Sequence, residues 1–375
     1  MWQKFNSRSL APFSYRNTYR QKFGARALEE IFPVTVTFFG ESTRFGMLEE
    51  ENGMSYVRLL NGRRICYREQ GVSREEAKRQ LIVIHGLGSS RLASMPGVSD
   101  TLLKAYGVRI VAIDRPGYGR SDIDEEQTFK STVQDIEKVA DTLNMGENFW
   151  LLGYSFGGAF CWACARYIPH RLAGVALWAP VGSFYWKGIL DEERHAMLNE
   201  ILFENRFIFG VGRYFPSWVI RLYTKYIVRP GTSWVKYLEK KLSEPDRKHL
   251  LIYGPGGSLI RDNVESLTTN RGYGMTKDLE LLVSDWGFEP EEVARVYKGS
   301  FQIWQGQEDN LVPKSLQRWV KNNVPDLVEL YELPNEGHLS WFCFNAKAHH
   351  KVLETLFGEY IPIDEDQATK EELTG

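Results

Sequence analysis

Residues 149–158 read FWLLGYSFGG, and this stretch decides the fold class. An apolar run typical of a buried strand leads into a Gly-x-Ser-x-Gly turn and then into a helical pattern that ends near Tyr167. Strand, tight turn and helix form the context in which this motif presents a serine nucleophile. The glycines let neighbouring chain pass close to a strained turn, and the helix start directs backbone N–H groups toward negative charge. We therefore expect Ser155 to be a nucleophile; a plain strand–turn–helix corner is the structural alternative.

Further strands and helices alternate on both sides of this motif. Two β-prone runs, 56–60 and 65–68, flank Asn61-Gly62, which predicts a hairpin. Short apolar runs predict strands at 81–84, 108–113, 149–152, 172–178, 300–305 and 327–333. Apolar residues at a spacing near 3.6 predict helices over 133–143 and 158–167. Alternating strands and helices predict an α/β fold with a mostly parallel, doubly wound sheet.

The strand rhythm stops between about residues 183 and 294, where the sequence is helical in pattern and rich in aromatics. We interpret this segment as a helical lid, or cap, inserted late in the sheet. The expected organisation is an N-terminal extension (1–50), the first part of the core (51–182), the lid (183–296), the second part of the core (297–361) and an acidic tail (362–375).

Composition narrows the function classes. The 375 residues include 43% hydrophobic and 25% charged residues, and the net charge is −2. This nearly balanced charge argues against a nucleic-acid partner, because such proteins are usually basic. Four cysteines in a chain of this length do not form a disulfide scaffold. The absence of any run of 18 apolar residues argues against a membrane-spanning helix.

The first 28 residues differ from the rest. They carry no acidic residue and six basic ones: Lys4, Arg8, Arg16, Arg20, Lys22 and Arg26. This composition is typical of an organelle-targeting segment, and a surface arm held by Trp2, Phe5 and Phe13 is the alternative. We expect an intracellular, cytoplasmic location, with organelle targeting as the alternative.

A serine hydroxyl needs a base and an orienting carboxylate. His338 follows the last predicted strand and Asp309 follows the strand before it, where catalytic groups gather in such sheets. Glu308 is the neighbouring alternative, expected to point the other way, and Asp309 could instead cap the helix starting near Pro313. The predicted catalytic residues are Ser155, Asp309 and His338, in the chain order of α/β-hydrolases.

Two backbone N–H groups should stabilise the oxyanion. We expect them at Phe156, directly after the nucleophile, and at Leu87, in the HGLG loop after strand 81–84. His85 in this loop is expected to hydrogen-bond backbone carbonyls rather than to transfer protons. Tyr154 and Leu339, next to the nucleophile and the base, are the expected substrate contacts.

No metal or cofactor is expected. Zinc-ligand spacings are absent from the sequence, and the glycines at 254–257 lack the frame of a phosphate-binding loop and are interpreted as a turn between lid helices. Cys161 and Cys164 lie within the helix after the nucleophile and are expected to pack rather than to react.

Taken together, these landmarks resemble the serine-type α/β-hydrolase-fold family, in its lid-bearing, esterase-like plant and microbial branch. The resemblance covers about residues 55–360 and rests on segments 85–88, 114–121, 153–158, 306–309 and 337–338. It implies a structural role for the loop DRPGYGRS that begins at Asp114. Family members that open epoxides or carbon–halogen bonds use an aspartate nucleophile, and Ser155 argues against that chemistry.

The lid segment 205–229 combines five basic residues with seven aromatic ones and has no acidic residue. The aromatics are Phe207, Phe209, Tyr214, Phe215, Trp218, Tyr223 and Tyr226. They would line a pocket for a hydrophobic substrate, or they would contact a membrane surface together with the basic side chains.

The sequence predicts a hydrolase that cleaves a carboxylic ester with a hydrophobic moiety through an acyl-enzyme. A ligand receptor with a slow triad, and an acyltransferase or amidase using the same residues, are the alternatives. The expected partner is a small hydrophobic ester, with peripheral membrane contact through the lid or the N-terminus as an additional expectation.

Overall fold

The computed structural model describes residues 37–38, 47–51, 53–228, 240–253, 266, 269–359 and 362. Three stretches that carry sequence-based predictions lie outside these ranges: the basic segment 1–28, the turn at 254–257 and the acidic residues 364–375.

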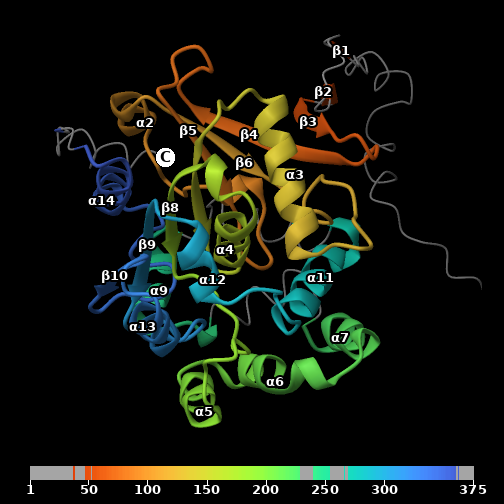
Figure 1. Ribbon diagram of the computed structural model, residues 1–375, viewed down its shortest axis with the longest axis vertical. Coiled ribbons are helices and arrows are strands. Elements are labelled where there is room, and N and C mark those ends of the chain that lie inside the picture. The colour runs from red at the N-terminus through yellow and green to blue at the C-terminus, as the bar shows by residue number, and fades with distance from the viewer. Residues whose placement is uncertain are drawn as a thin grey trace, which may run out of the picture.

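A ten-stranded sheet forms the centre of the molecule, in the order β1-β2-β3-β4-β6-β5-β7-β8-β9-β10 (Figure 1). The strands are β1 (Thr37–Phe38), β2 (Met47–Glu51), β3 (Met54–Arg58), β4 (Arg64–Gly71), β5 (Arg79–Ile84), β6 (Val108–Ile113), β7 (Phe149–Tyr154), β8 (Leu172–Trp178), β9 (Ser300–Gly306) and β10 (Val328–Leu333). Pairing is antiparallel from β1 through β4 to β6, and parallel from β6 onward. The predicted α/β fold with a mostly parallel sheet is therefore confirmed.

Helices cover both faces of this sheet. They are α2 (Asp100–Tyr106), α3 (Phe129–Thr142), α4 (Gly157–Tyr167), α12 (Pro290–Val296), α13 (Lys314–Asn323) and α14 (Ala346–Phe357). Side chains of α3, α4, α12 and α13 join one apolar cluster, and those of α2 and α14 join a second cluster. The continuous apolar strands supply both clusters, since successive side chains of a strand point to opposite faces: Ile82 and Ile84 belong to the first, Leu81 and Val83 to the second.

The predicted hairpin is present as β3 and β4. Its turn places Gly62 at a φ of 86°, a conformation that glycine adopts without steric strain. The structure also shows β2 beside β3, a strand that the sequence did not predict. Its sequence, MLEEE, lacks the alternation of apolar and polar residues that marks a strand, and its place in the sheet comes from pairing with β3.

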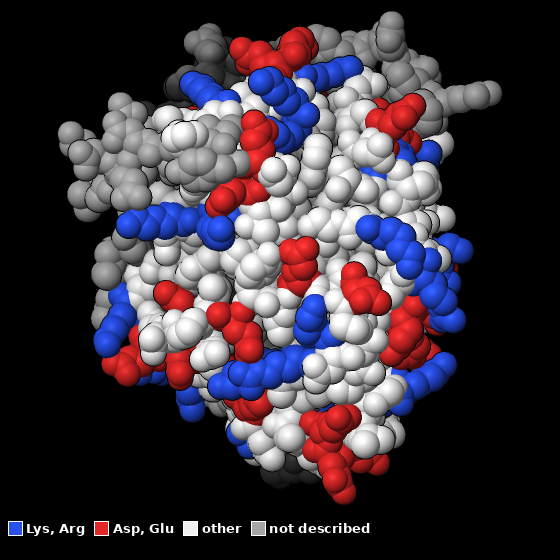
Figure 2. Space-filling model, turned by 60° about the vertical axis from the view of Figure 1, so that its left-hand side comes forward, with Lys and Arg blue, Asp and Glu red and all other residues white. Residues whose placement is uncertain are grey.

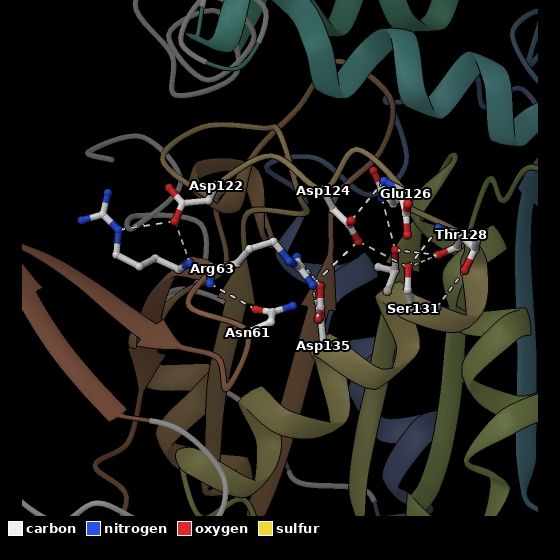
Figure 3. A network of polar contacts seen from close by, with 11 residues as sticks. Asn61, Arg63, Asp122, Asp124, Glu126, Thr128, Ser131 and Asp135 are labelled. Atoms are coloured by element: carbon white, nitrogen blue, oxygen red, sulfur yellow. Dashed lines mark hydrogen bonds and ion pairs between the residues drawn. The ribbon is translucent and has the colours of Figure 1, made fainter.

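A polar network fixes this hairpin to the start of α3 (Figure 3). Arg63 donates two hydrogen bonds to Asp135 of α3, with N–O distances of 2.8 and 2.7 Å, and lies 3.7 Å from Asp124. Thr128 and Ser131 form a capping box at the start of the helix. The antiparallel edge of the sheet is thereby tied to the helical layer by a bidentate ion pair.

Between β8 and β9 the described residues form helices. They are α5 (Asp191–Asn199), α6 (Phe203–Val211), η3 (Gly212–Tyr214), α7 (Ser217–Tyr223), η4 (Thr224–Val228), α9 (Glu244–Tyr253), η5 (Thr269–Gly272), α11 (Tyr273–Leu282) and α12. No described helix is both long enough and apolar enough to cross a membrane. We refer to this segment as the helical insertion; its function as a lid remains a prediction.

His349 of α14 is a titratable group inside the second apolar cluster. Its ring is 0% exposed and lies edge-on to Phe342, at 4.9 Å between ring centres, and burial lowers its pKa from 6.5 to about 4. The folded protein therefore keeps this ring neutral in the range where the unfolded chain takes up a proton.

We predict that this histidine makes the fold acid-sensitive. Stability is unaffected by His349 above pH 6.5 and falls as the pH drops toward 4, by roughly 3 kcal/mol at about 1.4 kcal/mol per pH unit between the two pKa values. Urea unfolding of His349→Gln across this range should show a shallower loss than the wild type, whereas the exposed His195→Gln should follow the wild type. Parallel pH dependence for all three proteins would contradict the assignment.

Candidate active site

Ser155 lies at the turn between β7 and α4, with its backbone in the left-handed region at a φ of 51°. Its N–H donates to Trp178 of β8 at 2.9 Å, and its carbonyl accepts from Gly158 and Val181 at 3.0 and 2.9 Å. Residues other than glycine rarely adopt this backbone conformation. It costs on the order of 1–3 kcal/mol and persists only because the surrounding contacts hold the residue in place. The predicted strained turn is present, and Ser155 is partly exposed between buried neighbours.

Close packing explains the glycines on either side of Ser155. A Cβ on Gly157 would lie 2.1 Å from the carbonyl oxygen of Ile84, and one on Gly153 would lie 2.5 Å from the sulfur of Cys161. Larger residues would push β5 and α4 away from the turn, so the spacing of the motif is a packing requirement.

Asp309, His338 and Ser155 all follow the carboxyl ends of strands in the same part of the sheet, and the first two are in contact. The strands β7, β8, β9 and β10 are neighbours, and the three residues follow the carboxyl ends of β7, β9 and β10. His338 Nδ1 lies 2.8 Å from Asp309 Oδ2, and both side chains are almost fully buried. The carboxylate can therefore fix the ring tautomer that leaves Nε2 available as a proton acceptor.

Asp309 also organises its own loop. Its Oδ1 accepts hydrogen bonds from the backbone of Leu311 and Val312, at 2.8 and 3.0 Å, and its Oδ2 accepts one from Gln305 at 3.1 Å. Asp309 therefore caps the turn that precedes α13, and it makes this contact as well as the one with His338. Glu308, the neighbouring alternative, is exposed.

The remaining histidines lie elsewhere in the fold. His170 and His195 are exposed, His249 and His350 are partly buried, and His349 is enclosed in the apolar cluster described above.

A carboxylate that the sequence did not indicate holds the histidine loop. Asp246 of α9 accepts hydrogen bonds from the backbone N–H groups of His338, Leu339 and Ser340, at 2.8, 2.7 and 3.0 Å, and from the hydroxyl of Ser243 at 2.9 Å. The side chain is completely buried, and a Cβ on Gly337 would lie 2.4 Å from its oxygens. The helical insertion thereby positions the loop that carries the candidate base.

The charge around His338 favours its protonated form. Burial alone would lower the pKa of the ring, but the Asp309 carboxylate, through its charge and hydrogen bond, and the charge of Asp246 outweigh burial, and the pKa lies above 6.5. An imidazolium formed during a reaction would be stabilised by these two carboxylates.

The loop after β5 is held by Arg115, a residue whose role the sequence did not reveal. Its Nη2 donates to the carbonyl of Gly86 at 3.0 Å and to Asp278 of α11 at 2.7 Å. His85 accepts the Arg115 backbone N–H at Nε2, so its Nδ1 carries the proton toward the Gly86 carbonyl at 2.8 Å. Burial, together with the Arg115 charge, keeps the pKa of His85 well below 6.5. The expected ordering role of His85 is confirmed.

Peptide geometry relates these contacts to the two expected oxyanion donors. In a trans peptide the N–H points opposite to the preceding C=O. The Gly86 carbonyl faces Arg115, so the Leu87 N–H points to the other side of the loop. The Ser155 carbonyl likewise faces the start of α4 and Val181, which turns the Phe156 N–H away from them. A Cβ on Gly86 would lie 3.0 Å from that of Ser155, so this loop passes beside the candidate nucleophile.

The two expected substrate contacts occupy different environments. Tyr154 is 8% exposed, stacks on Trp178 at 5.0 Å and hydrogen-bonds Ser89, so its ring lies beneath the loop at Gly86. Leu339 is partly buried and donates its N–H to Asp246. Their contact with substrate remains a prediction.

Metal and thiol chemistry receive no support from the described residues. Within them, no three His, Cys, Asp or Glu side chains gather as a metal ion would require. Cys161 and Cys164 are buried in α4, where desolvation raises the pKa of both thiols. Both are therefore packing residues, as expected.

The family follows from a match over most of the chain. The model of the α/β hydrolase fold family matches residues 80–342, and the protein belongs to this family. Family membership supports a hydrolase.

Curated relatives match shorter segments. The chain is 36% identical over 76 residues to epoxide hydrolase B of Mycobacterium tuberculosis, covering 20% of this chain and 21% of that protein. It is 30% identical over 122 residues to the abhydrolase domain-containing protein abhd-5.2 of Caenorhabditis elegans, covering 31% and 26%. The matched segments thus span about a fifth to a quarter of the length of these relatives.

Solved structures share the fold over most of the chain. An esterase from Exiguobacterium antarcticum aligns with a TM-score of 0.54 at 18% identity, covering 81% of this chain and 97% of the esterase. The esterase RhEst1 from Rhodococcus aligns with a TM-score of 0.55 at 17% identity, covering 81% and 99%.

We predict that Asp246→Asn loosens the loop of His338. The amide keeps one acceptor oxygen but loses the charge, and hydrogen bonds to a charged group contribute about 1.5–3 kcal/mol each. Hydrogen exchange at residues 338–340 should accelerate by roughly tenfold or more, since about 1.4 kcal/mol corresponds to a factor of ten.

The matched control is Glu244→Gln, which removes an exposed carboxylate from the same helix. Its exchange at residues 338–340 should equal that of the wild type. Unchanged protection in Asp246→Asn would show that these three N–H groups do not depend on the carboxylate.

Proposed function

We propose that the protein is a serine hydrolase that cleaves a carboxylic ester with a hydrophobic moiety through an acyl-enzyme intermediate. The observation that carries this proposal is the buried contact of 2.8 Å between His338 and Asp309 at the sheet edge where Ser155 ends its strand in a left-handed turn. A nucleophile, a base and an orienting carboxylate are the groups that acyl transfer requires.

The reaction would proceed in two steps. Ser155 Oγ attacks the ester carbonyl and gives its proton to His338 Nε2, while Asp309 stabilises the imidazolium that forms. The tetrahedral intermediate collapses, the bond to the alcohol oxygen breaks, and His338 returns the proton to the leaving alcohol. Water then attacks the acyl-enzyme by the same route and releases the acid and Ser155.

The N–H groups of Leu87 and Phe156 would bind the oxyanion in both steps. Their directions, set by the partners of the Gly86 and Ser155 carbonyls, support this role. Leu87 and Tyr223 both pack against the buried cluster of Tyr118 and Met275, and such apolar side chains favour a hydrophobic acyl or alcohol group.

The nucleophile distinguishes ester cleavage from epoxide opening. One relative is named an epoxide hydrolase, and two solved structures of the same fold are named esterases. Ser155 stands where the resemblance places an aspartate in the enzymes that open epoxides, so an acyl-enzyme is the favoured intermediate.

Removal of the nucleophile tests the proposal. Ser155→Ala should lower kcat for p-nitrophenyl esters by roughly 10⁵–10⁶-fold, as in other serine triads, and should abolish labelling by a fluorophosphonate. The matched control is Ser284→Ala, at a partly buried serine of the insertion whose hydroxyl donates to the carbonyls of Leu281 and Asp285, and it should retain both.

Near-normal turnover by Ser155→Ala would refute the mechanism. A single burst of product without turnover in the wild type would favour the ligand receptor, and ester products with added alcohols would favour acyl transfer. A panel of p-nitrophenyl esters and lysolipids would then define the acyl group.

We further predict that kcat/KM rises with pH through a pKa above 6.5, because His338 must be neutral to accept the proton from Ser155. Asp246→Asn removes one of the charges that raise this pKa, so the midpoint should move to lower pH. The pH–rate profile of Glu244→Gln should keep the wild-type midpoint. An unchanged or higher midpoint in Asp246→Asn would contradict the electrostatic role of Asp246.

A further inference from the structure

The helical insertion exposes an unusual amount of apolar surface. Among the described residues, eight of the thirteen exposed large apolar side chains lie within residues 203–226. Phe203 and Tyr214 are each 76% exposed and Trp218 is 61% exposed. Of the seven aromatics expected to line a pocket or to contact a membrane, five are exposed, Tyr223 is partly buried and only Phe209 is buried. We call the exposed apolar side chains of residues 203–226 the insertion patch.

The patch is one continuous surface built by two neighbouring helices. Phe203 and Phe207 are one turn apart on α6, and Trp218 and Leu222 are one turn apart on α7. The ring of Phe207 lies 6.2 Å from that of Tyr223 on α7, which joins the two rows. Both helices lie at one end of the long axis of the molecule, away from the sheet (Figure 1).

Positive charge accompanies these apolar side chains. Residues 203–226 contain one acidic residue, Glu204, and four basic ones, of which Arg213, Arg221 and Lys225 are exposed. Two of the cations lie over tyrosine rings: Arg213 over Tyr185 at 4.3 Å and Lys225 over Tyr226 at 5.1 Å. Arg221 pairs with Glu280 of α11.

We propose that the insertion patch docks the protein on an anionic lipid membrane. Aromatic rings mixed with Lys and Arg suit the boundary between headgroups and acyl chains, where the rings enter the boundary and the cations meet lipid phosphates. A second copy of the chain is a poorer complement, because a two-fold contact through the patch would bring the exposed cations Arg213, Arg221 and Lys225 of both copies toward one another. The face seen in Figure 2 intersperses both signs of charge. The proposal does not depend on the chemistry at Ser155.

The test is co-sedimentation of the full chain with phosphatidylcholine vesicles, with and without phosphatidylserine. The wild type and Ser155→Ala should bind mixed vesicles equally, and binding should weaken with added salt. The double variant Trp218→Ser/Leu222→Ser should bind at least about tenfold more weakly, because two apolar side chains no longer enter the lipid. Arg213→Gln/Lys225→Gln should lose the preference for phosphatidylserine.

The matched control is Leu60→Ser/Leu190→Ser, which removes two side chains that are 73% and 67% exposed outside the patch. It should bind as the wild type does. The proposal is overturned if the wild type does not bind, or if Trp218→Ser/Leu222→Ser binds unchanged, as it would if the basic segment 1–28 were the membrane contact. It is also overturned if sedimentation analysis reveals an oligomer of the wild type that this variant disperses, since the patch would then join two copies.

Discussion

The candidate site depends on one unfavourable backbone conformation, the left-handed turn at Ser155. Three main-chain hydrogen bonds, to Trp178, Gly158 and Val181, hold this residue in a backbone conformation that a non-glycine residue rarely adopts. The same bonds turn its carbonyl inward, and the N–H of Phe156 consequently points the other way. One strained residue thereby presents a hydroxyl and orients the N–H group that we propose as an oxyanion donor. The parallel sheet supplies the rigid frame that the strain requires.

Two buried carboxylates extend this organisation into the helical insertion. Asp246 accepts three N–H groups from the loop of His338, and Asp278 binds Arg115, which in turn holds the Gly86 carbonyl. The loop of the proposed base and the loop of the proposed oxyanion donor Leu87 are thus each held by a carboxylate of the helical insertion. Unpairing a buried charge of this kind typically costs about 3–5 kcal/mol. The insertion is therefore part of the site's construction.

The sequence was most informative where local pattern sets structure. The elbow at 153–158, the hairpin at Asn61-Gly62 and the alternating strands and helices follow from turn chemistry and periodicity, and the contact of Asp309 with His338 follows from strand ends meeting at one edge. Asp246 was missed because its partners lie 92 to 94 residues away and are backbone groups, which leave no residue pattern. The exposure of Trp218 could likewise not be predicted from the sequence, because tertiary context decides whether an aromatic residue at helical spacing faces the interior or the surface.

The two acid anchors also bear on how such a chain can diversify. Here a transplanted insertion without Asp246 would leave three amides of the histidine loop without their acceptor. A core without Arg115 would leave the buried carboxylate of Asp278 with the Tyr118 hydroxyl but without its positively charged partner. The core and the insertion should therefore evolve together. New specificities should arise by substitutions within the insertion and not by replacement of the whole insertion.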